Sequence, residues 1–296
     1  MRIFVTGATG FVGTAVVREL LDAGHQVLGM ARSDAGAKSL IDAGAEVHRG
    51  DIEDLKSLRS GAEAADAVIH TAFVHDFSRF QEVCKIDRQA IEALGSTLAG
   101  SDRPLIVTGG LGGISPGRTM SELDAAPPVS NSYPRASEQT AVALAERGVR
   151  ASVVRLPQVH NTVKAGLVSY AIAIARNKGA SAYIGDGHNR WAAVHLLDAA
   201  RLYRLVLEKG EPGARYHAVA EEGVPVRDIA EVIGRGLKVP VVSLTPQEAA
   251  GHFGWLAGFA GWDLAGSSEL TQQKLGWRPT GPRLIADLEN MRYSQG

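Results

Sequence analysis

Three glycines near the amino terminus, Gly7, Gly10 and Gly13, have a spacing that lets a backbone loop hold a diphosphate. Residues 3–6 before them are apolar or β-branched, which predicts a short buried strand. Apolar residues recur at helical spacing over residues 15–21, so a helix should follow the glycines. Free N–H groups and the positive end of the helix dipole would then face the phosphates. The glycine spacing in this setting predicts dinucleotide binding.

The same segment, TGATGFVG, resembles the cofactor loop of the short-chain dehydrogenase/reductase superfamily. Its TGxxGxxG form is typical of the extended and atypical branches, whose members are epimerase/dehydratase-like. Residues 268–279 resemble the Leu-Gly-Trp-x-Pro segment that closes such proteins, so the likeness spans nearly the whole chain. It implies a Rossmann α/β fold, which is a doubly wound parallel sheet with a smaller C-terminal substrate domain, and a nicotinamide dinucleotide cofactor.

The end of the second predicted strand, residues 25–30, should distinguish NAD from NADP. NAD sites usually place an acid there to bond the ribose 2′-hydroxyl, whereas an arginine suits a 2′-phosphate. Aligned on the glycines, the acid position falls on Ala31, and Arg32 and Ser33 supply donors for a phosphate. The sequence therefore favours NADP(H). In the alternative, Arg32 is a solvated loop charge and Asp34 binds the ribose.

The family resemblance implies further cofactor contacts along the chain. A Gly-Asp-Ile segment places Asp51 and Ile52 at the adenine, although Asp51 could instead cap the helix predicted over residues 53–64. The strand over residues 67–72 resembles one that passes under the nicotinamide ribose, and LPQVHN resembles the segment that holds the carboxamide. The predicted cofactor contacts are Gly7, Thr9, Gly10, Phe11, Val12, Gly13, Arg32, Ser33, Asp51, Ile52, Thr71, Ala72, Phe73, Thr108, Pro157 and Val159.

The family's catalytic Tyr-x-x-x-Lys is degenerate here, where the chain reads NSYPRASEQTAV. With Tyr133 as the tyrosine, the lysine position holds Ser137. A shift by one residue places Pro134 and Glu138 there instead, and the substrate-binding serine position falls on Gly110. A phenol with a pKa of about 10 is a poor base without a nearby cation, yet it can donate a proton to a carbonyl that receives hydride. Tyr133 is therefore a candidate proton donor in a reductase, or only the residue before a helix that starts at Pro134.

Side chains that follow predicted strands are candidates for the substrate side. His75 and Asp76 could exchange protons, although adjacent polar residues in loops are usually only solvated. His160 is expected at the pocket mouth and could trade protons near neutral pH, although an exposed loop histidine is more often incidental. His195 and Asp198 resemble a hinge and a helix start rather than a catalytic pair. The candidates to contact substrate or line its pocket are His75, Leu111, His160, Tyr183, His188 and Trp191.

The regular alternation of strands and helices loosens after residue 160. We expect a dinucleotide-binding domain over residues 1–160, completed by part of residues 190–220, and a substrate-binding domain mainly over residues 161–296. A group of aromatic residues should form the core of the smaller domain, with an apolar lid over a bulky substrate as the alternative. This group is Phe253, Trp255, Phe259 and Trp262.

The composition restricts the functional class. The formal net charge is −1, so the chain lacks the basic excess needed to neutralise nucleic-acid phosphates. A single cysteine, Cys84, makes an intrachain disulfide impossible and fits a reducing cytoplasm. We recognise no signal peptide, no apolar run of membrane-spanning length and no metal site in the sequence. A cytoplasmic location is therefore expected.

These features predict an NADPH-dependent oxidoreductase that reduces a carbonyl, C=N or C=C bond of a small, mostly apolar substrate. A non-catalytic NADP(H)-binding sensor or regulatory protein is the alternative, because the lysine and the serine hydroxyl are both missing. A nucleotide-sugar epimerase or dehydratase is less favoured, since such enzymes usually need the full tyrosine–lysine pair to oxidise the sugar first. We expect a small-molecule substrate as the partner, without nucleic acid or membrane, and a homodimer is compatible with the sequence.

Overall fold

The computed structural model describes residues 1–112, 117–131 and 133–293. Its largest sheet contains β1 (Arg2–Thr6), β2 (Gln26–Ala31), β3 (Glu46–Arg49), β4 (Ala67–His70), β5 (Leu105–Gly110), β6 (Ala151–Leu156) and β10 (Arg215–His217). The spatial order is β10-β6-β5-β4-β1-β2-β3, and these strands pair in parallel. The chain order reverses between β1 and β4, which is where ligands bind in doubly wound sheets. The predicted fold class is confirmed.

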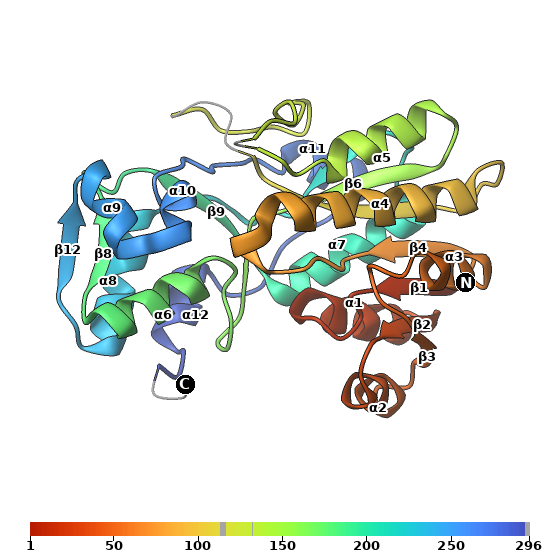
Figure 1. Ribbon diagram of the computed structural model, residues 1–296, viewed down its shortest axis with the longest axis horizontal. Coiled ribbons are helices and arrows are strands. Elements are labelled where there is room, and N and C mark those ends of the chain that lie inside the picture. The colour runs from red at the N-terminus through yellow and green to blue at the C-terminus, as the bar shows by residue number, and fades with distance from the viewer. Residues whose placement is uncertain (113–116, 132, 294–296) are drawn as a thin grey trace.

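Hydrophobic cores lie on both faces of this sheet. Side chains of β1 alternate between the faces, so Ile3 and Val5 pack in one core while Phe4 packs in the other. Figure 1 shows α4 and α5 on the side of the sheet opposite to α1. The helices over the first core are α1 (Phe11–Asp22) and α7 (Leu196–Lys209), and those over the second are α3 (Leu55–Glu63), α4 (Phe80–Leu98) and α5 (Ser137–Glu146).

A second group of elements lies at the other end of the molecule (Figure 1). A three-stranded sheet has the order β11-β9-β7, and a separate pair joins β12 to β8 in parallel. The strands are β7 (Gln158–His160), β8 (Ser181–Ile184), β9 (Arg190–His195), β11 (Glu221–Pro225) and β12 (Val241–Leu244), and the helices are α6 (Val168–Lys178), α8 (Val226–Leu237), α9 (Pro246–Phe253), α10 (Ala257–Ala260) and α12 (Leu284–Glu289). The proposed domain boundaries stay a prediction.

The start of α5 differs from the prediction. The helix predicted to begin at Pro134 begins at Ser137, because Tyr133 closes a turn with Ser130 through paired backbone hydrogen bonds. Within the described ranges, no helix is both long enough and apolar enough to cross a bilayer. The remaining elements are α2 (Asp34–Asp42), α11 (Glu269–Leu275), η1 (Phe77–Arg79) and η2 (Gly254–Leu256).

Candidate functional site

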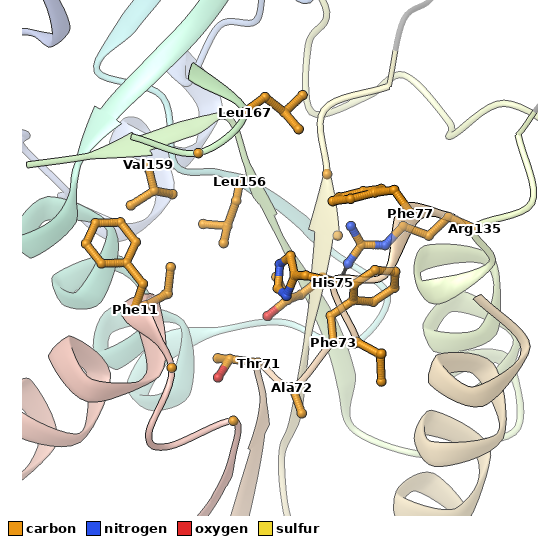
Figure 2. A pocket seen from close by; sticks show the side chains of 18 of the residues that line it. Phe11, Thr71, Ala72, Phe73, His75, Phe77, Arg135, Leu156, Val159 and Leu167 are labelled. Atoms are coloured by element: carbon orange, nitrogen blue, oxygen red, sulfur yellow. Dashed lines mark hydrogen bonds between the residues drawn. The ribbon is translucent and has the colours of Figure 1, made fainter. Parts of the chain in front are cut away.

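A cavity of about 780 Å³ opens at the carboxyl ends of β1, β4, β5 and β6, beside the reversal in strand order. Its walls come from the glycine loop (residues 7–13), the segments after β4 and β5, the β6–β7 segment and residues 258–264. Figure 2 shows Phe11 of the glycine loop, Phe73 and His75 after β4, and Leu156 and Val159 of the β6–β7 segment. Every predicted cofactor contact lines this cavity except Ser33 and Asp51. Most of the residues that the sequence predicts to contact the cofactor therefore lie around one cavity. Their contact with a cofactor stays a prediction.

Two glycines of the glycine loop, Gly7 and Gly13, leave no room for a side chain. Gly7 has a φ of +66°, and a Cβ built on it would lie 2.6 Å from the backbone nitrogen of Ala72. A Cβ on Gly13 would lie 2.0 Å from the carbonyl oxygen of Gly7. Gly10, which has no side chain to cap the first turn, is the N-cap of α1, so N–H groups of that turn can face an anion. The loop fits the diphosphate of a dinucleotide.

Arg32 reaches the cavity from the end of β2, with 71% of its side chain exposed. Its Nη1 atom lies 3.5 Å from Asp51 Oδ2, which is a long and weak contact. Ser33 lies outside the lining because its hydroxyl caps α2, where it accepts a hydrogen bond from the backbone N–H of Gly36. Arg32 is therefore free to bind an anion, whereas Ser33 already has a structural task.

The two carboxylates near Arg32 also have protein partners. Asp34 forms an ion pair with Arg49. Asp51 lies outside the cavity lining, and its Oδ1 accepts a hydrogen bond from the backbone N–H of Glu53 at 2.9 Å. The N-cap of α3 is Asp54, so the interpretation of Asp51 as the cap of that helix is wrong.

Tyr133 lines the opposite part of the cavity. A Cβ built on Gly112 would lie 3.1 Å from its hydroxyl oxygen, so the phenol covers this glycine. Burial raises the pKa of Tyr133 above its usual value, although the positive charge of Arg135 opposes the shift. The phenol is therefore protonated at neutral pH and can act as a proton donor.

The two positions aligned with the missing lysine have structural partners. Ser137 is buried at the start of α5, and its Oγ donates to Asp87 Oδ2 at 2.6 Å. Glu138 is also buried, and its carboxylate pairs with Arg155 and Arg215 at 2.6 Å each. Burial alone would raise the pKa of Glu138, but the hydrogen bond and charge of Arg155 lower it below the usual value. Neither position supplies a cation to Tyr133.

The carboxyl end of β5 forms the floor of this part of the cavity. Thr108 lines it, but its hydroxyl donates to the carbonyl oxygen of His70 at 2.7 Å and lies 2.6 Å from Tyr203 Oη. Its hydroxyl is therefore already engaged inside the protein. Gly110 also lines the cavity.

His75 and Leu111 are the two predicted substrate contacts that line the cavity. The pKa of His75 is lowered by burial and further by the charges of Lys164 and Arg135, so its imidazole is neutral at pH values near 7. Asp76 is the N-cap of η1, where its side chain accepts hydrogen bonds from its chain neighbours. Only the histidine of this polar pair is a cavity residue.

Two cations that line the cavity, Arg135 and Lys164, were not predicted from the sequence as site residues. Arg135 stands two residues after Tyr133, so a base beside a tyrosine that lacks its lysine was an available signal. Lys164 lies in the segment after β7, and no motif marks it. The phenylalanine spacing after β4 was a second unused signal, because Phe73, Phe77 and Phe80 all line the cavity.

The aromatic group at residues 253–262 divides between core and wall. Phe253 is 4% exposed and packs in a small hydrophobic core. Phe259 and Trp262 line the cavity. Trp255 stacks on Phe77 with ring centroids 4.2 Å apart and planes 3° from parallel. The core interpretation is therefore confirmed for Phe253, whereas an apolar lid over a substrate stays a prediction for Phe259 and Trp262.

His160 and Trp191 lie outside the cavity, contrary to expectation. His160 is fully buried, and its Nδ1 atom lies 2.7 Å from Asp287 Oδ2. Its expected place at the mouth is wrong because residues 158–160 form β7 rather than an open loop. Trp191 is 2% exposed in β9, where its indole N–H donates to the carbonyl oxygen of Trp262 at 3.2 Å.

Tyr183 and His188 are also absent from the cavity lining. Tyr183 lies in β8, where the guanidinium of Arg227 covers its ring at 5.8 Å. His188 is an exposed residue that pairs with Asp186 at 3.3 Å. Tyr183 packs within the second group of elements, and His188 lies on its surface. The sequence pattern could not distinguish either position from a pocket wall.

His195 and Asp198 have structural contacts around the start of α7. His195 is the N-cap of this helix. The carboxylate of Asp198 is buried and accepts hydrogen bonds from the backbone N–H groups of Thr280 and Gly281. These contacts tie α7 to the segment before α12.

Comparison with known proteins places these features in a family. Residues 3–83 match the model of the NAD dependent epimerase/dehydratase family. An uncharacterized protein of Schizosaccharomyces pombe is 49% identical over 99% of this chain and 100% of its own length. An uncharacterized protein of Saccharomyces cerevisiae is 45% identical over 97% and 98% of the two chains. The decarboxylating sterol-4-alpha-carboxylate 3-dehydrogenase of Dictyostelium discoideum is 28% identical over 76% of this chain and 73% of that enzyme.

Solved structures share the fold. A dTDP-glucose 4,6-dehydratase of Streptomyces venezuelae with NAD bound has a TM-score of 0.77 at 20% identity, over 99% of this chain and 96% of that chain. A UDP-glucose 4-epimerase of Thermotoga maritima with UDP-glucose has a TM-score of 0.75 at 20% identity, over 99% and 97% of the two chains. The chain thus belongs to one family with the two uncharacterized yeast proteins, its residues 3–83 match the NAD dependent epimerase/dehydratase family, and its fold is that of the solved dehydratase and epimerase.

Proposed function

We propose that this protein is an NADPH-dependent oxidoreductase that reduces a carbonyl, C=N or C=C bond of a small, mostly apolar substrate. The observation that carries the proposal is the continuity of one cavity from the glycine loop to a wall of aromatic rings. The dinucleotide would occupy the first part and supply hydride when bound. The rings that would enclose the substrate are Phe73, Phe77, Phe80, Tyr170, Phe259 and Trp262.

Arg32 supports NADPH as the cofactor. Its guanidinium is exposed at the cavity and, among the residues that the structure describes, has only the long contact to Asp51. A ribose 2′-phosphate there would form charge-assisted hydrogen bonds with it. Asp34, the alternative ribose ligand, is paired with Arg49. The charge balance at the end of β2 therefore favours a phosphate over a plain hydroxyl.

Tyr133 supports reduction as the direction of the reaction. A reduced carbonyl oxygen must receive a proton, whereas oxidation of an alcohol requires a base. Burial keeps the Tyr133 phenol protonated at neutral pH, and no lysine follows at the family position. The phenol is thus suited to donate a proton rather than to remove one.

The walls argue against the two competing functions. A nucleotide-sugar substrate would place hydroxyl groups against the aromatic rings, so an epimerase or dehydratase is less well supported. A sensor of NADP(H) would not need an apolar chamber beyond its nucleotide. In the proposal, residues 1–160 with part of residues 190–220 bind the dinucleotide. Residues 161–296 contribute Tyr170, Phe259 and Trp262 to the substrate wall.

The test follows NADPH absorbance with a panel of aldehydes, ketones, imines and enones. We expect turnover by the wild-type protein and a fall in kcat of about a hundredfold in Tyr133→Phe, with NADPH affinity unchanged. The matched control is Tyr183→Phe, whose ring lies outside the cavity and whose activity should equal wild type. Tight NADPH binding without turnover of any compound would favour the sensor. Unchanged turnover in Tyr133→Phe would remove this residue from the mechanism.

A further inference from the structure

Arg135 lies beside Gly110, the position that the family resemblance assigns to the substrate-binding serine. Gly110 has no side chain at that position, and a Cβ built on it would lie 3.7 Å from Arg135 Nη1. Nη1 has no hydrogen-bond acceptor in the part of the chain that the structure describes. Figure 2 shows the guanidinium beside Phe73 and His75, and Arg135 lines the cavity. The N–H groups of Nη1 are therefore available to a ligand at the end of β5.

Three contacts fix the plane of this guanidinium. Nη2 donates to the carbonyl oxygen of Thr108 at 3.1 Å, and Nε donates to Ser137 Oγ at 2.9 Å. The Cζ atom lies 4.6 Å from the centroid of the Phe73 ring, which is a cation–π contact. An arginine held in this way loses little freedom when a ligand binds. Such preorganised donors are the ones that stabilise charge developing in a transition state.

A buried hydrogen-bond chain supports Ser137 from behind. Its Oγ donates to Asp87 Oδ2 at 2.6 Å, Asp87 Oδ1 lies 3.2 Å from His70 Nε2, and His70 Nδ1 lies 2.8 Å from Thr6 Oγ1. Burial alone would raise the pKa of Asp87, but hydrogen bonds and charges, led by those of His70, lower it below the usual value. The negative charge of Asp87 therefore offsets Arg135 from outside the cavity.

The lining of the cavity carries cations and, among the described residues, no carboxylate. Arg32 follows β2, Arg135 lies beside Gly110 at the end of β5, and Lys164 lies near Phe11. Lys164 Nζ forms no ion pair within the described ranges, and it lies 5.7 Å from the centroid of the Phe11 ring. Burial and the charges of Lys164 and Arg135 together lower the pKa of His75, so positive potential converges on that region. Such a region attracts a negatively charged oxygen.

We propose that Arg135 is a catalytic residue whose Nη1 binds the carbonyl oxygen of an apolar substrate. This inference rests on the proposed function. Of the carbonyl, C=N and C=C bonds considered there, it selects the carbonyl as the bond that is reduced. As the carbonyl carbon gains hydride from NADPH, the π electrons move to the oxygen. The oxygen takes the proton of the Tyr133 hydroxyl, and the phenolate regains a proton from water. Arg135 stabilises the negative charge that develops on the carbonyl oxygen and on the Tyr133 phenolate oxygen. In the family, the serine and the lysine have these tasks.

The experiment measures binding of a charged oxygen on an apolar body. Calorimetry on the protein loaded with NADP⁺ compares trans-cinnamate with uncharged cinnamamide at neutral pH. We expect cinnamate to bind about tenfold more tightly than the amide in the wild-type protein. Arg135→Met should abolish this preference and leave NADP⁺ affinity within about twofold of wild type. The matched control is Arg88→Met on the exposed face of α4, which changes the net charge equally and should keep the preference.

A second variant guards against misfolding of Arg135→Met. Gly110→Val keeps the arginine but fills the space in front of Nη1, which is the atom nearest to a Cβ at that position. It should also abolish the preference for cinnamate. Arg135→Lys keeps the charge without the planar fork and should recover only part of it. A wild-type protein without the preference, or a preference that survives in both Arg135→Met and Gly110→Val, would overturn the proposal.

Turnover measurements separate this proposal from the function on which it rests. A fall in kcat/KM of about a hundredfold in Arg135→Met, with carbonyl substrates reduced by the wild-type protein, supports both. Unchanged kcat/KM in that variant overturns the role of Arg135 and leaves the reductase intact. The cinnamate preference without turnover of any carbonyl compound supports the oxygen-binding site and contradicts the reductase.

Discussion

Ser137 Oγ lies between Arg135 Nε, at 2.9 Å, and Asp87 Oδ2, at 2.6 Å. The hydroxyl has one proton, which it donates to the carboxylate, while its lone pair accepts from the guanidinium. Ser137 is the fourth residue after Tyr133, where the family carries its lysine. The family's lysine position therefore holds a serine that positions Arg135, and Arg135 supplies the positive charge at the cavity instead.

Replacement of Ser137 by alanine tests this anchor. Ser137→Ala removes an acceptor from Arg135 and a donor from the buried Asp87, so we expect a loss of about 1–3 kcal/mol in the free energy of unfolding. Cinnamate affinity should fall, but less than in Arg135→Met. The matched control is Thr140→Val, which removes another buried hydroxyl of α5 that donates to the carbonyl oxygen of Ala136. Equal cinnamate affinity in Ser137→Ala and wild type would show that Arg135 needs no such support.

The choice of cofactor depends on Arg32. We expect Arg32→Ala to weaken NADPH binding by about tenfold or more and NADH binding by less than about twofold, because only NADPH carries a 2′-phosphate on its adenosine ribose. Fluorescence titration with both nucleotides measures the two affinities. Arg49→Ala is the control, since it removes an equal charge nearby and leaves Asp34 without its ion-pair partner. Equal losses of NADPH and NADH affinity in Arg32→Ala would contradict the assignment of NADP.

The glycine loop predicts a steep cost for one methyl group. Gly13→Ala would place its Cβ 2.0 Å from the carbonyl oxygen of Gly7, so the start of α1 must move away from β1. We expect loss of dinucleotide binding and a destabilisation of about 1–3 kcal/mol in thermal unfolding. Gly251→Ala in α9, whose Cβ would meet no described atom within 4 Å, should instead be neutral or stabilising. Dinucleotide affinity at the wild-type level in Gly13→Ala would refute this account of the loop.

His217 predicts a loss of stability in mild acid. Burial, followed by the charge of Arg155, lowers its pKa to about 4, below the value of about 6.5 for an unfolded histidine. Between these values the unfolded chain binds a proton that the folded chain does not. The free energy of unfolding therefore falls as the pH falls through this interval. The contacts explain the shift, because Arg155 Nη1 donates to His217 Nε2 at 3.0 Å and a second proton there would face the guanidinium.

Urea unfolding from neutral pH to about pH 5 measures this effect. His217→Gln should be less stable than wild type at neutral pH but should have a shallower pH dependence. His188→Gln, which changes an exposed histidine, should follow the slope of the wild-type protein. Parallel slopes for His217→Gln and wild type would assign the acid sensitivity to other groups.

Local spacing explains what the sequence could predict. The strand, the glycine loop and the start of α1 are contiguous, so their geometry follows from residues within a few positions of one another. The same holds for the segments that end β4, β5 and β6, because the carboxyl ends of parallel strands meet at one edge of the sheet. This is why nearly all of the predicted cofactor contacts share a cavity.

Long-range packing explains what the sequence could not predict. Whether Tyr183, Trp191 or Phe259 faces the cavity depends on how β8, β9 and the segment after α9 pack together. Only Phe259 does so. The role of Ser137 could not be predicted either, because its partner Asp87 comes from α4, fifty positions earlier in the chain. Local spacing carries no information about such pairs.

The position of β10 in the sheet has a consequence for synthesis on the ribosome. β6 pairs with β5 on one side, but its other edge stays bare until Arg215–His217 has been made and docks beside it. One of the two helices that cover the first core, α7, also emerges late. A nascent chain that stops at residue 160 therefore presents both an open strand edge and an apolar face that α1 covers only in part, which are features that chaperones bind and that lead to aggregation.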